Sequence, residues 1–517
     1  MTRKINFLEI CGFALVLGAA QGFSIAPHWA LIQLLSLAGI CFLFLYSSSV
    51  ARSTFLGFLF GLGWFSSSVY WIYFSIHDYG YQPAWVAGIA VVAFASLLAI
   101  FPAAAGLLSG LGLRDRSRKN RVFFLLIAPA AWALTEWLRT WVLSGFPWAA
   151  GAYAHIEGPL SVFAPVIGAT GINYLAALTA GLICLFVLSM KRRDIWTANL
   201  VAVAFLALLG SAFLLKEKTW SEPGETVNFR LIQGGIAQNE KFSPMGTEQS
   251  FARYTEEMSA PGLKKDAVIV LPETIFPIPF DKLPTKMLKE LTKVTEEKGN
   301  PLILGAFIRS PEGGYANTAI LIEKGSKFGF YFKKHLVPFG EYVPFGFRWF
   351  IDMLGIPMAN LKEGNVSQEP FTVVDQVSVA PTLCYEDLFS ETIRQWWSKG
   401  EAPGILINLS NLGWFGDSAA LPQHLSISRM RAKEFARPIV RATNTGATAA
   451  INEKGQIIAR LPFMVPGKLD VAVTAAIGKP TPYASLGDLP SVLVMLLSLV
   501  AGIGLSWCRK PKASSQH

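Results

Sequence analysis

The stretch VSVAPTLCYEDLFSETIRQWW, residues 377–397, joins a β-rich run to an amphipathic segment. Its first part, VSVAPTLC, is short and apolar, which predicts a buried strand. Its second part places Ile393, Trp396 and Trp397 among charged residues, which predicts a helix. A strand that runs directly into a helix is typical of an α/β layered fold. Cys384 lies at the junction, so we expect its sulfur near the free backbone N–H groups of the helix start, a setting that lowers a thiol pKa.

The same alternation of β-rich runs and helical stretches continues before and after this junction, over residues 218–486. Charged residues, Pro and Gly are frequent in it, and helical stretches such as TKMLKELTKVTEEKG separate several short β-rich runs. Strands that alternate with helices predict a mixed sheet covered by helices, so we expect a folded α/β domain. The further β-rich runs are NFRLIQGGI, DAVIVLPE, PLILGAFI, ANTAILIE, APGILINLS, PIVRATN and GATAAINE.

Outside this domain the chain is strongly apolar. Of its 517 residues, 52% are hydrophobic and only 15% are charged, and its mean hydropathy is +0.41. A membrane-spanning helix needs roughly 20 mostly apolar residues, which predicts a polytopic α-helical membrane domain of about eight spans. The first candidate is followed at once by another apolar run, so we interpret it as a retained span and not a signal peptide. The candidate stretches are 10–26, 29–48, 54–76, 85–113, 122–143, 159–190, 195–215 and 487–507.

The basic residues indicate how these spans are oriented. Lys and Arg gather before the first span, on alternate loops and after the last span, whereas loops such as SIAPHW and HDYGYQPAW carry neither. Because basic residues are retained on the cytoplasmic side, both termini are predicted to be cytoplasmic and the α/β domain to lie outside. The predicted domains are a seven-span region at 1–217, the α/β domain at 218–486, and a C-terminal transmembrane helix with a cytoplasmic tail at 487–517. The net charge of +10 has no basic stripe or recognition motif behind it, so no nucleic acid partner is expected.

Four of the five cysteines lie in or beside apolar spans, where we interpret them as small packing residues. Cys384 alone lies in the α/β domain, so it has no disulfide partner there. A lone thiol in this place is either buried and inert or retained for its reactivity. Its position at a strand end favours the reactive interpretation, provided that a base and a cation lie nearby. The four other cysteines are Cys11, Cys41, Cys184 and Cys508.

Two other strand ends supply these groups. In DAVIVLPETIFP, Glu273 follows an apolar strand, where a carboxylate has no packing role, although a helix-capping or surface Glu is the alternative. The segment FGFYFKKHLVPFGEYVPF carries Lys333, Lys334, His335 and Glu341 in an aromatic, Pro-punctuated setting. A buried Lys there needs a partner; solvated surface lysines are the alternative.

Taken together, these three segments resemble the carbon–nitrogen hydrolase (nitrilase) superfamily, whose Glu-Lys-Cys triad lies on successive strand ends of an α-β-β-α sandwich. The order matches here as Glu273, Lys333 and Cys384. The longer strings look similar to the apolipoprotein N-acyltransferase family, and with the eight-span layout the resemblance covers nearly the whole chain. One departure is Leu412-Gly413, where an Asp-Ala type pair is expected. The strings are KKHLVPFGEYVP, PTLCYED, NLSNLGWFGDS, PQHL, RPIVRATNTGATAAI and EWLRTWVLSGFPW.

The resemblance implies a ping-pong acyl transfer in a bacterial inner membrane, with the catalytic domain in the periplasm. An acyl chain would pass from a phospholipid to Cys384 as a thioester, and then to the α-amino group of the N-terminal diacylglyceryl-cysteine of an apolipoprotein. Glu273 would act as the base, while Lys333 and the backbone N–H of Tyr385 would stabilise the oxyanion. Glu341 would orient Lys333, and Glu386 would help to hold the site; both are alternatively structural carboxylates.

Several apolar residues are candidates for contact with lipid. RWFIDMLGIPMANL, residues 348–361 and including Trp349, is interpreted either as a mobile arm together with Trp414 and Phe415, or as an extra core helix. Arg139 stands one helical turn from Glu136, so it either binds a lipid headgroup or simply neutralises that carboxylate.

The sequence also suggests what the site does not require. The six histidines show no metal-ligand spacing, and His335 and His424 are interpreted as hydrogen-bonded structural residues. We therefore expect no metal, no cofactor and a monomeric enzyme whose partners are phospholipid, apolipoprotein and membrane lipids. Two alternatives stay open: a membrane-anchored amidase that uses water as the second nucleophile, and a scaffold or transporter whose outer domain is catalytically silent.

Overall fold

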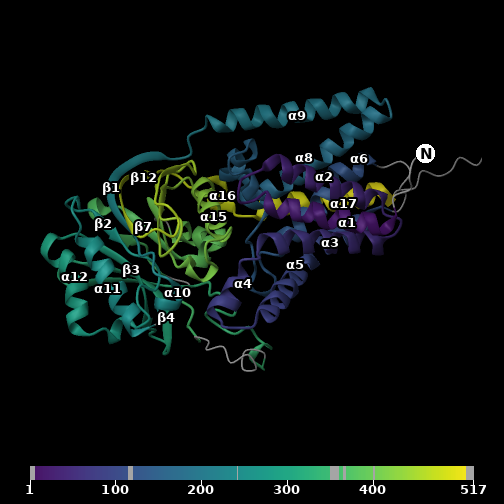
Figure 1. The fold of residues 1–517 in the computed structure, drawn as a ribbon. Helices are drawn as coiled ribbons and strands as arrows, with labels where there is room; N and C mark the ends of the chain where they lie inside the picture. The colour runs from purple at the N-terminus through teal and green to yellow at the C-terminus, as the bar shows by residue number, and fades with distance from the viewer. Residues whose placement is uncertain are drawn as a thin grey trace, which may run out of the picture. The chain divides into compact units, whose positions relative to one another are not determined.

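The computed structural model describes residues 6–113, 120–241, 243–349, 360–364, 368–399 and 402–507. The chain divides into two compact units (Figure 1). One unit is helical and comprises Met1–Tyr70, Ile89–Lys218 and Asp488–His517. The other comprises Thr219–Gly487 together with Trp71–Gly88, a short segment that the sequence places between two apolar helices.

Apolar helices occupy all eight predicted stretches. By length and composition, five helices of the described residues are suited to cross a bilayer, and a sixth qualifies if α3 and the pieces after it count as one. Helices α1 and α2 are shorter, at 17 residues each; such a helix is roughly 26 Å long, close to the lower limit for spanning. The eight are α1 (Phe7–Phe23), α2 (Ala30–Tyr46), α3 (Val50–Ser68), α5 (Ala84–Gly112), α7 (Ala128–Leu138), α8 (Ala164–Lys191), α9 (Ile195–Lys216) and α17 (Leu489–Trp507).

The third predicted stretch, 54–76, is divided in the structure. Helix α3 ends at Ser68, and α4 (Ile72–Phe74) and the π-helix η1 (Ser75–Tyr79) follow. The hydroxyls of Ser67 and Ser68 both donate to the backbone oxygen of Trp64. Serine hydroxyls that bond back to the preceding turn weaken and bend a helix, which accounts for the break.

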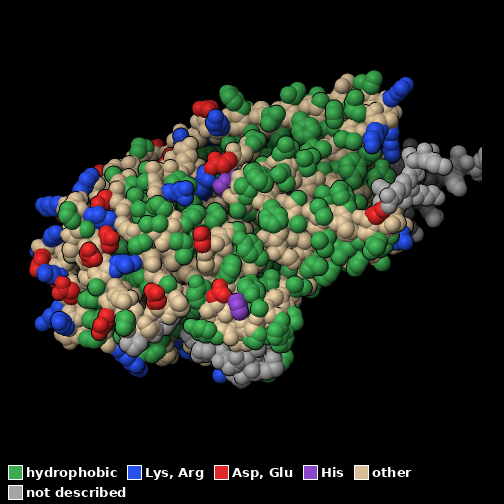
Figure 2. All heavy atoms as spheres, in the orientation of Figure 1, with side chains coloured by type: hydrophobic (Ala, Val, Ile, Leu, Met, Phe, Trp, Pro, Cys, Tyr) green, Lys and Arg blue, Asp and Glu red, His purple; other side chains and the backbone are tan. Residues whose placement is uncertain are grey.

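The surfaces of the two units differ in composition. Figure 2 shows hydrophobic side chains nearly continuous over the helical unit and charged side chains scattered over the α/β unit. Large apolar side chains on the helices are strongly exposed, including Leu8 at 80%, Trp196 at 69% and Leu497 at 69%. Exposed apolar area of this extent is typical of a surface that faces lipid.

The α/β unit contains two six-stranded sheets, and the expected α-β-β-α sandwich is confirmed. The strand order is β12-β1-β2-β3-β4-β5 in the first sheet and β11-β10-β9-β8-β7-β6 in the second. The first sheet is formed by β1 (Glu222–Gln233), β2 (Val268–Val270), β3 (Leu302–Arg309), β4 (Tyr315–Glu323), β5 (Lys327–Phe332) and β12 (Gly467–Ile477). The second is formed by β6 (Phe371–Thr372), β7 (Ser378–Leu383), β8 (Ile405–Ser410), β9 (Ile439–Thr443), β10 (Ala449–Ile451) and β11 (Ile457–Arg460).

The core lies between the sheets and beneath the helices. One buried cluster joins side chains of both sheets, such as Leu231 and Leu383, and a second joins the outer face of the first sheet to its helices, as Ile269 does with Leu291. Strands β2 and β8 are buried along their whole length and β7 is buried from its second residue on, as expected for strands covered on both faces. The longest helices of the unit are α11 (Pro244–Ser259), α12 (Thr285–Lys298) and α15 (Ala420–Phe435).

Candidate active site

Three strands end at the same place in the α/β unit. Glu273 follows β2, Lys333 follows β5 directly and Cys384 follows β7 directly. Although the first two strands belong to one sheet and the third to the other, the side chains meet: Lys333 Nζ lies 3.1 Å from Glu273 Oε1, and both residues act on the titration of Cys384. The turns after the strands are tight, since Thr274 and Cys384 have φ angles of 48° and 47°. Such left-handed angles in residues other than Gly cost roughly 1–2 kcal/mol each and recur at functional sites.

A bridging lysine organises the acidic side of this cluster. Lys333 is 1% exposed, and its Nζ also lies 3.0 Å from Glu341 Oε1. Burial alone would lower the pKa of Lys333, but Glu273 and Glu341 outweigh it and raise the pKa above its ordinary value. Lys333 is therefore a permanent cation held between two carboxylates.

Asn317 is a member of the cluster that the sequence reasoning missed. Its Nδ2 donates to Glu273 Oε1 at 2.7 Å and to Glu341 Oε1 at 2.8 Å, so one amide fixes both carboxylates. It lies in the middle of β4, where its side chain is 2% exposed. The available signal was the polar Asn within the apolar run ANTAILIE, because a polar residue inside a buried strand requires hydrogen-bond partners.

The sulfur of Cys384 lies close to Glu273. The backbone N–H of Asn411 donates to Glu273 Oε2 at 3.0 Å, and both residues influence the titration of the Cys384 thiol. Cys384 as a whole residue is partly exposed, whereas its sulfur is buried.

The predicted low thiol pKa is wrong. Burial raises the pKa of the Cys384 thiol, Glu273 raises it further, and Lys333 offsets this only in part. The segment that starts at Cys384 is a five-residue 3-10 turn, Cys384–Leu388, and not the start of a long helix. It therefore supplies too small a dipole to overcome desolvation.

The raised pKa of Cys384 predicts how the alkylation rate of this thiol depends on pH. Because a raised pKa keeps Cys384 protonated at neutral pH, its alkylation by iodoacetamide should accelerate about tenfold per pH unit between about pH 7 and pH 9. Peptide mapping by mass spectrometry at several pH values measures this rate separately from the other cysteines. A rate that levels off below about pH 8 would contradict the assignment.

The Glu386 carboxylate connects two of the strand ends by hydrogen bonds. One of its oxygens, Oε1, accepts from the Tyr331 hydroxyl at 3.0 Å and from the backbone N–H of Lys334 at 2.7 Å, while Oε2 accepts from Leu383 N–H at 2.7 Å. Burial raises the pKa of Glu386 to about 7 despite these donors. The side chain thus links the residue after Lys333 to the residue before Cys384.

The other candidate residues lie in different settings. The Tyr385 ring is buried and packs against both His335 and Phe389, which stack on each other. Arg139 belongs to the helical unit, where it is 1% exposed and paired with Glu136 at 3.0 Å. This pairing is the neutralising arrangement that the sequence suggested as one alternative.

The lipid-contact candidates of the α/β unit cluster on one short segment. Phe415 packs against Trp71 with ring centroids 4.4 Å apart and the ring planes tilted by 60°, and the backbone oxygen of Trp414 accepts from the Ser75 hydroxyl at 2.6 Å. Trp349 is 65% exposed. Within the proposed arm 348–361, residues 350–359 lie outside the described residues, so the arm stays a prediction.

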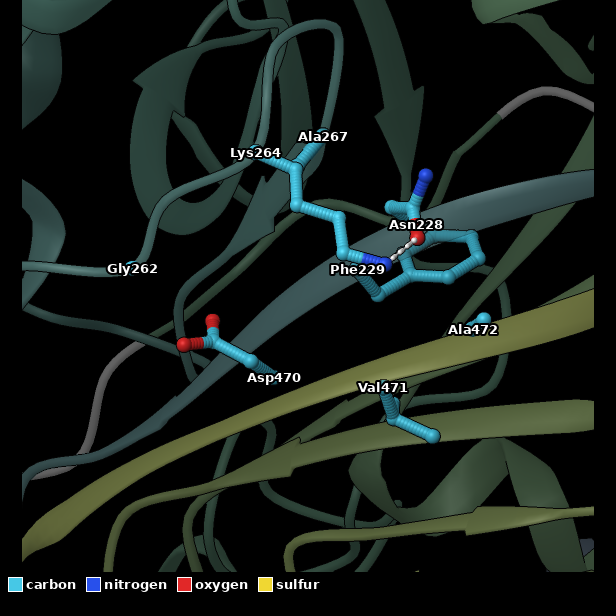
Figure 3. Close-up of a pocket in the computed structure, with 8 residues that line it drawn as sticks. All are labelled: Asn228, Phe229, Gly262, Lys264, Ala267, Asp470, Val471 and Ala472. Carbon is cyan, nitrogen blue, oxygen red and sulfur yellow. Dashed lines mark hydrogen bonds between the residues drawn. The ribbon is translucent and has the colours of Figure 1, made fainter.

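The described residues include no candidate metal cluster, and one small hollow lies apart from this site. No group of three or more His, Cys, Asp or Glu side chains among the described residues is arranged to hold a metal ion. A hollow of about 60 Å³ near β1 and β12 is lined by residues that include Asn228, Lys264 and Asp470 (Figure 3). It shares no residue with the Glu273–Lys333–Cys384 cluster.

Known proteins match this chain over nearly its whole length. Residues 13–182 match the apolipoprotein N-acyltransferase N-terminal domain family, and residues 232–479 match the carbon-nitrogen hydrolase family. The apolipoprotein N-acyltransferase of Ralstonia nicotianae is 39% identical over 494 residues, which cover 95% of this chain and 92% of that protein. That of Chromobacterium violaceum is 36% identical over 516 residues, or 98% and 96% of the two chains. Among solved structures, a carbon-nitrogen hydrolase from Helicobacter pylori is 16% identical, with a TM-score of 0.35 over 48% of this chain and 89% of that one.

Proposed function

Because the chain belongs to the apolipoprotein N-acyltransferase family, we propose that it carries an acyl chain from a phospholipid to an apolipoprotein as a thioester on Cys384. It is an N-acyltransferase built on a carbon–nitrogen hydrolase domain, and the resemblance of its motifs to this family is confirmed. The supporting observation is the cluster itself: one buried ammonium lies 3.1 and 3.0 Å from two carboxylates beside the thiol of Cys384.

In the first half-reaction, the Cys384 sulfur attacks the ester carbonyl carbon of the phospholipid while Glu273 takes the thiol proton. General-base assistance is needed because the thiol pKa is raised and little thiolate is present beforehand. Lys333 Nζ and the Tyr385 backbone N–H stabilise the tetrahedral oxyanion, an effect worth roughly 2.7–4 kcal/mol per donor in comparable sites. The carbon–oxygen bond to glycerol then breaks, Glu273 returns the proton to the leaving oxygen, and a lysophospholipid departs.

In the second half-reaction, the neutral α-amino group of the diacylglyceryl-cysteine attacks the thioester carbon. Glu273 takes a proton from the nitrogen and gives it to the departing sulfur, so an amide forms and the thiol is restored. A thioester is readily attacked by amines and a thiol leaves well, which explains a cysteine where esterases use serine. Water must be kept from the intermediate for the amide to be favoured over the free acid.

We also propose that the enzyme works as a monomer in a bacterial inner membrane, with the α/β domain in the periplasm and both termini in the cytoplasm. The alternation of basic and non-basic loops supports this orientation. Both substrates carry fatty chains and reside in the bilayer, so the apolar helices would hold the enzyme in the same membrane as its substrates.

Mass spectrometry of the intact protein tests the proposed function. After incubation with phospholipid, we expect the mass of one acyl chain on Cys384, and we expect it to disappear when a diacylglyceryl lipopeptide with a free amine is added. The same lipopeptide with an acetylated amine is the control and should leave the adduct in place. Discharge by water alone at the same rate would instead indicate a hydrolase, and the absence of any adduct would exclude the thioester.

A further inference from the structure

His424 contacts the backbone of the candidate nucleophile, Cys384. It is on α15, its side chain is 0% exposed, and its Nε2 lies 3.3 Å from the backbone oxygen of Cys384. On the other side of the ring, Nδ1 lies 2.6 Å from Nη2 of Arg441, a residue of β9. The reaction scheme above leaves this buried histidine without a role.

The protonation of His424 follows from its neighbours. A guanidinium has only donors, so Nδ1 must accept from Arg441 and must carry no hydrogen. A neutral imidazole then carries its hydrogen on Nε2, which donates it to the Cys384 oxygen. Burial lowers the pKa of His424 well below its ordinary value and Arg441 lowers it further, so the ring is neutral.

Arg441 is itself held in place. Its Nη1 lies 3.1 Å from Asp387 Oδ2 and also donates to the hydroxyl of Ser428, which in turn bonds to Asp387. Arg441 and Asp387 are both almost fully buried, at 0% and 1% exposure. The ion pair therefore fixes the guanidinium that selects the His424 tautomer.

The orientation of one peptide unit connects this chain of contacts to the chemistry. The oxygen of Cys384 and the N–H of Tyr385 belong to the same planar trans peptide and point in opposite directions. A donor that holds the oxygen in place thereby aims the N–H to the other side. Asn408 Nδ2 contacts the same oxygen at 3.4 Å, a weaker second restraint. This restraint is needed because Cys384 has a φ of 47°. In a free chain, a residue other than Gly disfavours this left-handed conformation and the peptide orientation that goes with it.

We propose that His424 is a positioning residue, which holds the Cys384 carbonyl through its Nε2–H and thereby aims the Tyr385 N–H at the oxyanion of both half-reactions. The proposal rests on the proposed function, in which Cys384 carries the acyl group. His424 touches neither substrate nor sulfur in this role and exchanges no proton. His424 therefore stabilises only those transition states that contain an oxyanion, and it does not affect other reactions of the thiol.

Two substitutions and two reactions test the proposal. His424→Leu removes the donor, whereas His424→Gln can present an amide N–H where Nε2–H lies. We expect the single-turnover rate of Cys384 acylation to fall roughly 10- to 100-fold in His424→Leu, with the KM for phospholipid unchanged, and to lie within about threefold of wild type in His424→Gln. Alkylation of Cys384 by iodoacetamide forms no oxyanion, so its rate should stay within about twofold of wild type in both variants. Ser426→Ala, on the same helix, is the matched control and should leave both rates unchanged.

The outcomes separate the competing explanations. A parallel fall of acylation and alkylation in His424→Leu would show that the residue supports the site as a whole and would overturn the proposal. Wild-type acylation in His424→Leu would overturn it as well, as would a folded His424→Gln that is as slow as His424→Leu. Acylation of the wild-type protein is measured in the same experiment, so a failure of the proposed function shows itself separately as a wild type that forms no acyl-Cys384.

Discussion

Replacing Cys384 with Ala is expected to reduce N-acylation of a lipopeptide to background, a loss of roughly 10⁴-fold or more. The proposed pathway has no other nucleophile, and removal of a covalent nucleophile elsewhere costs a comparable or larger factor. Cys384→Ser should be nearly as inactive, because a hydroxyl is a far weaker nucleophile and an oxygen ester is attacked slowly by amines. The measurement is lipopeptide N-acylation by mass spectrometry, with purified variants in the same lipid.

Cys41→Ala and Cys184→Ala are the matched controls for this prediction. Both residues are buried cysteines of the helical unit, so each substitution removes a thiol without touching the cluster. They should retain activity within a few-fold, after correction for the amount of folded protein. Substantial activity in Cys384→Ala would exclude the thioester, and would favour direct transfer or the catalytically silent domain that the sequence left open.

Glu273→Gln is expected to lower kcat by roughly 10²- to 10⁴-fold, the usual range for loss of a general base. The amide has nearly the shape of the carboxylate, and Lys333 keeps Glu341 as a partner at 3.0 Å, so we expect the protein to remain folded. The effect should be large because Glu273 accepts a proton in both half-reactions and the thiol pKa is raised. Single-turnover acylation and steady-state transfer are measured side by side.

The ratio of kinetic constants distinguishes this role from substrate binding. A raised KM with an unchanged kcat would mean that Glu273 holds the substrate and does not act as a base. Glu290→Gln, an exposed carboxylate on α12, makes the same chemical change far from the cluster in sequence and serves as the control. It should leave both constants unchanged.

The sequence located the candidate site better than it described it. Glu273, Lys333 and Cys384 each follow an apolar run, and a polar side chain at the end of a buried strand is visible without a structure. The thiol pKa was wrongly predicted because the sequence shows the dipole of a helix start and not the protein that covers the sulfur. Asn317 was missed since its two partners lie 44 and 24 residues away in the chain.

The proportion of apolar residues, their runs and the loop charges are properties of the chain alone, and they suffice to predict eight apolar helical stretches and an α/β domain. Strand periodicity and the order of the three chemical groups are equally local. The packed structure was needed to learn which carboxylates share Lys333, in which direction the pKa of Cys384 is shifted and which tautomer His424 adopts. These depend on desolvation and on distances between residues remote in sequence, and both quantities exist only once the sheets and helices have packed.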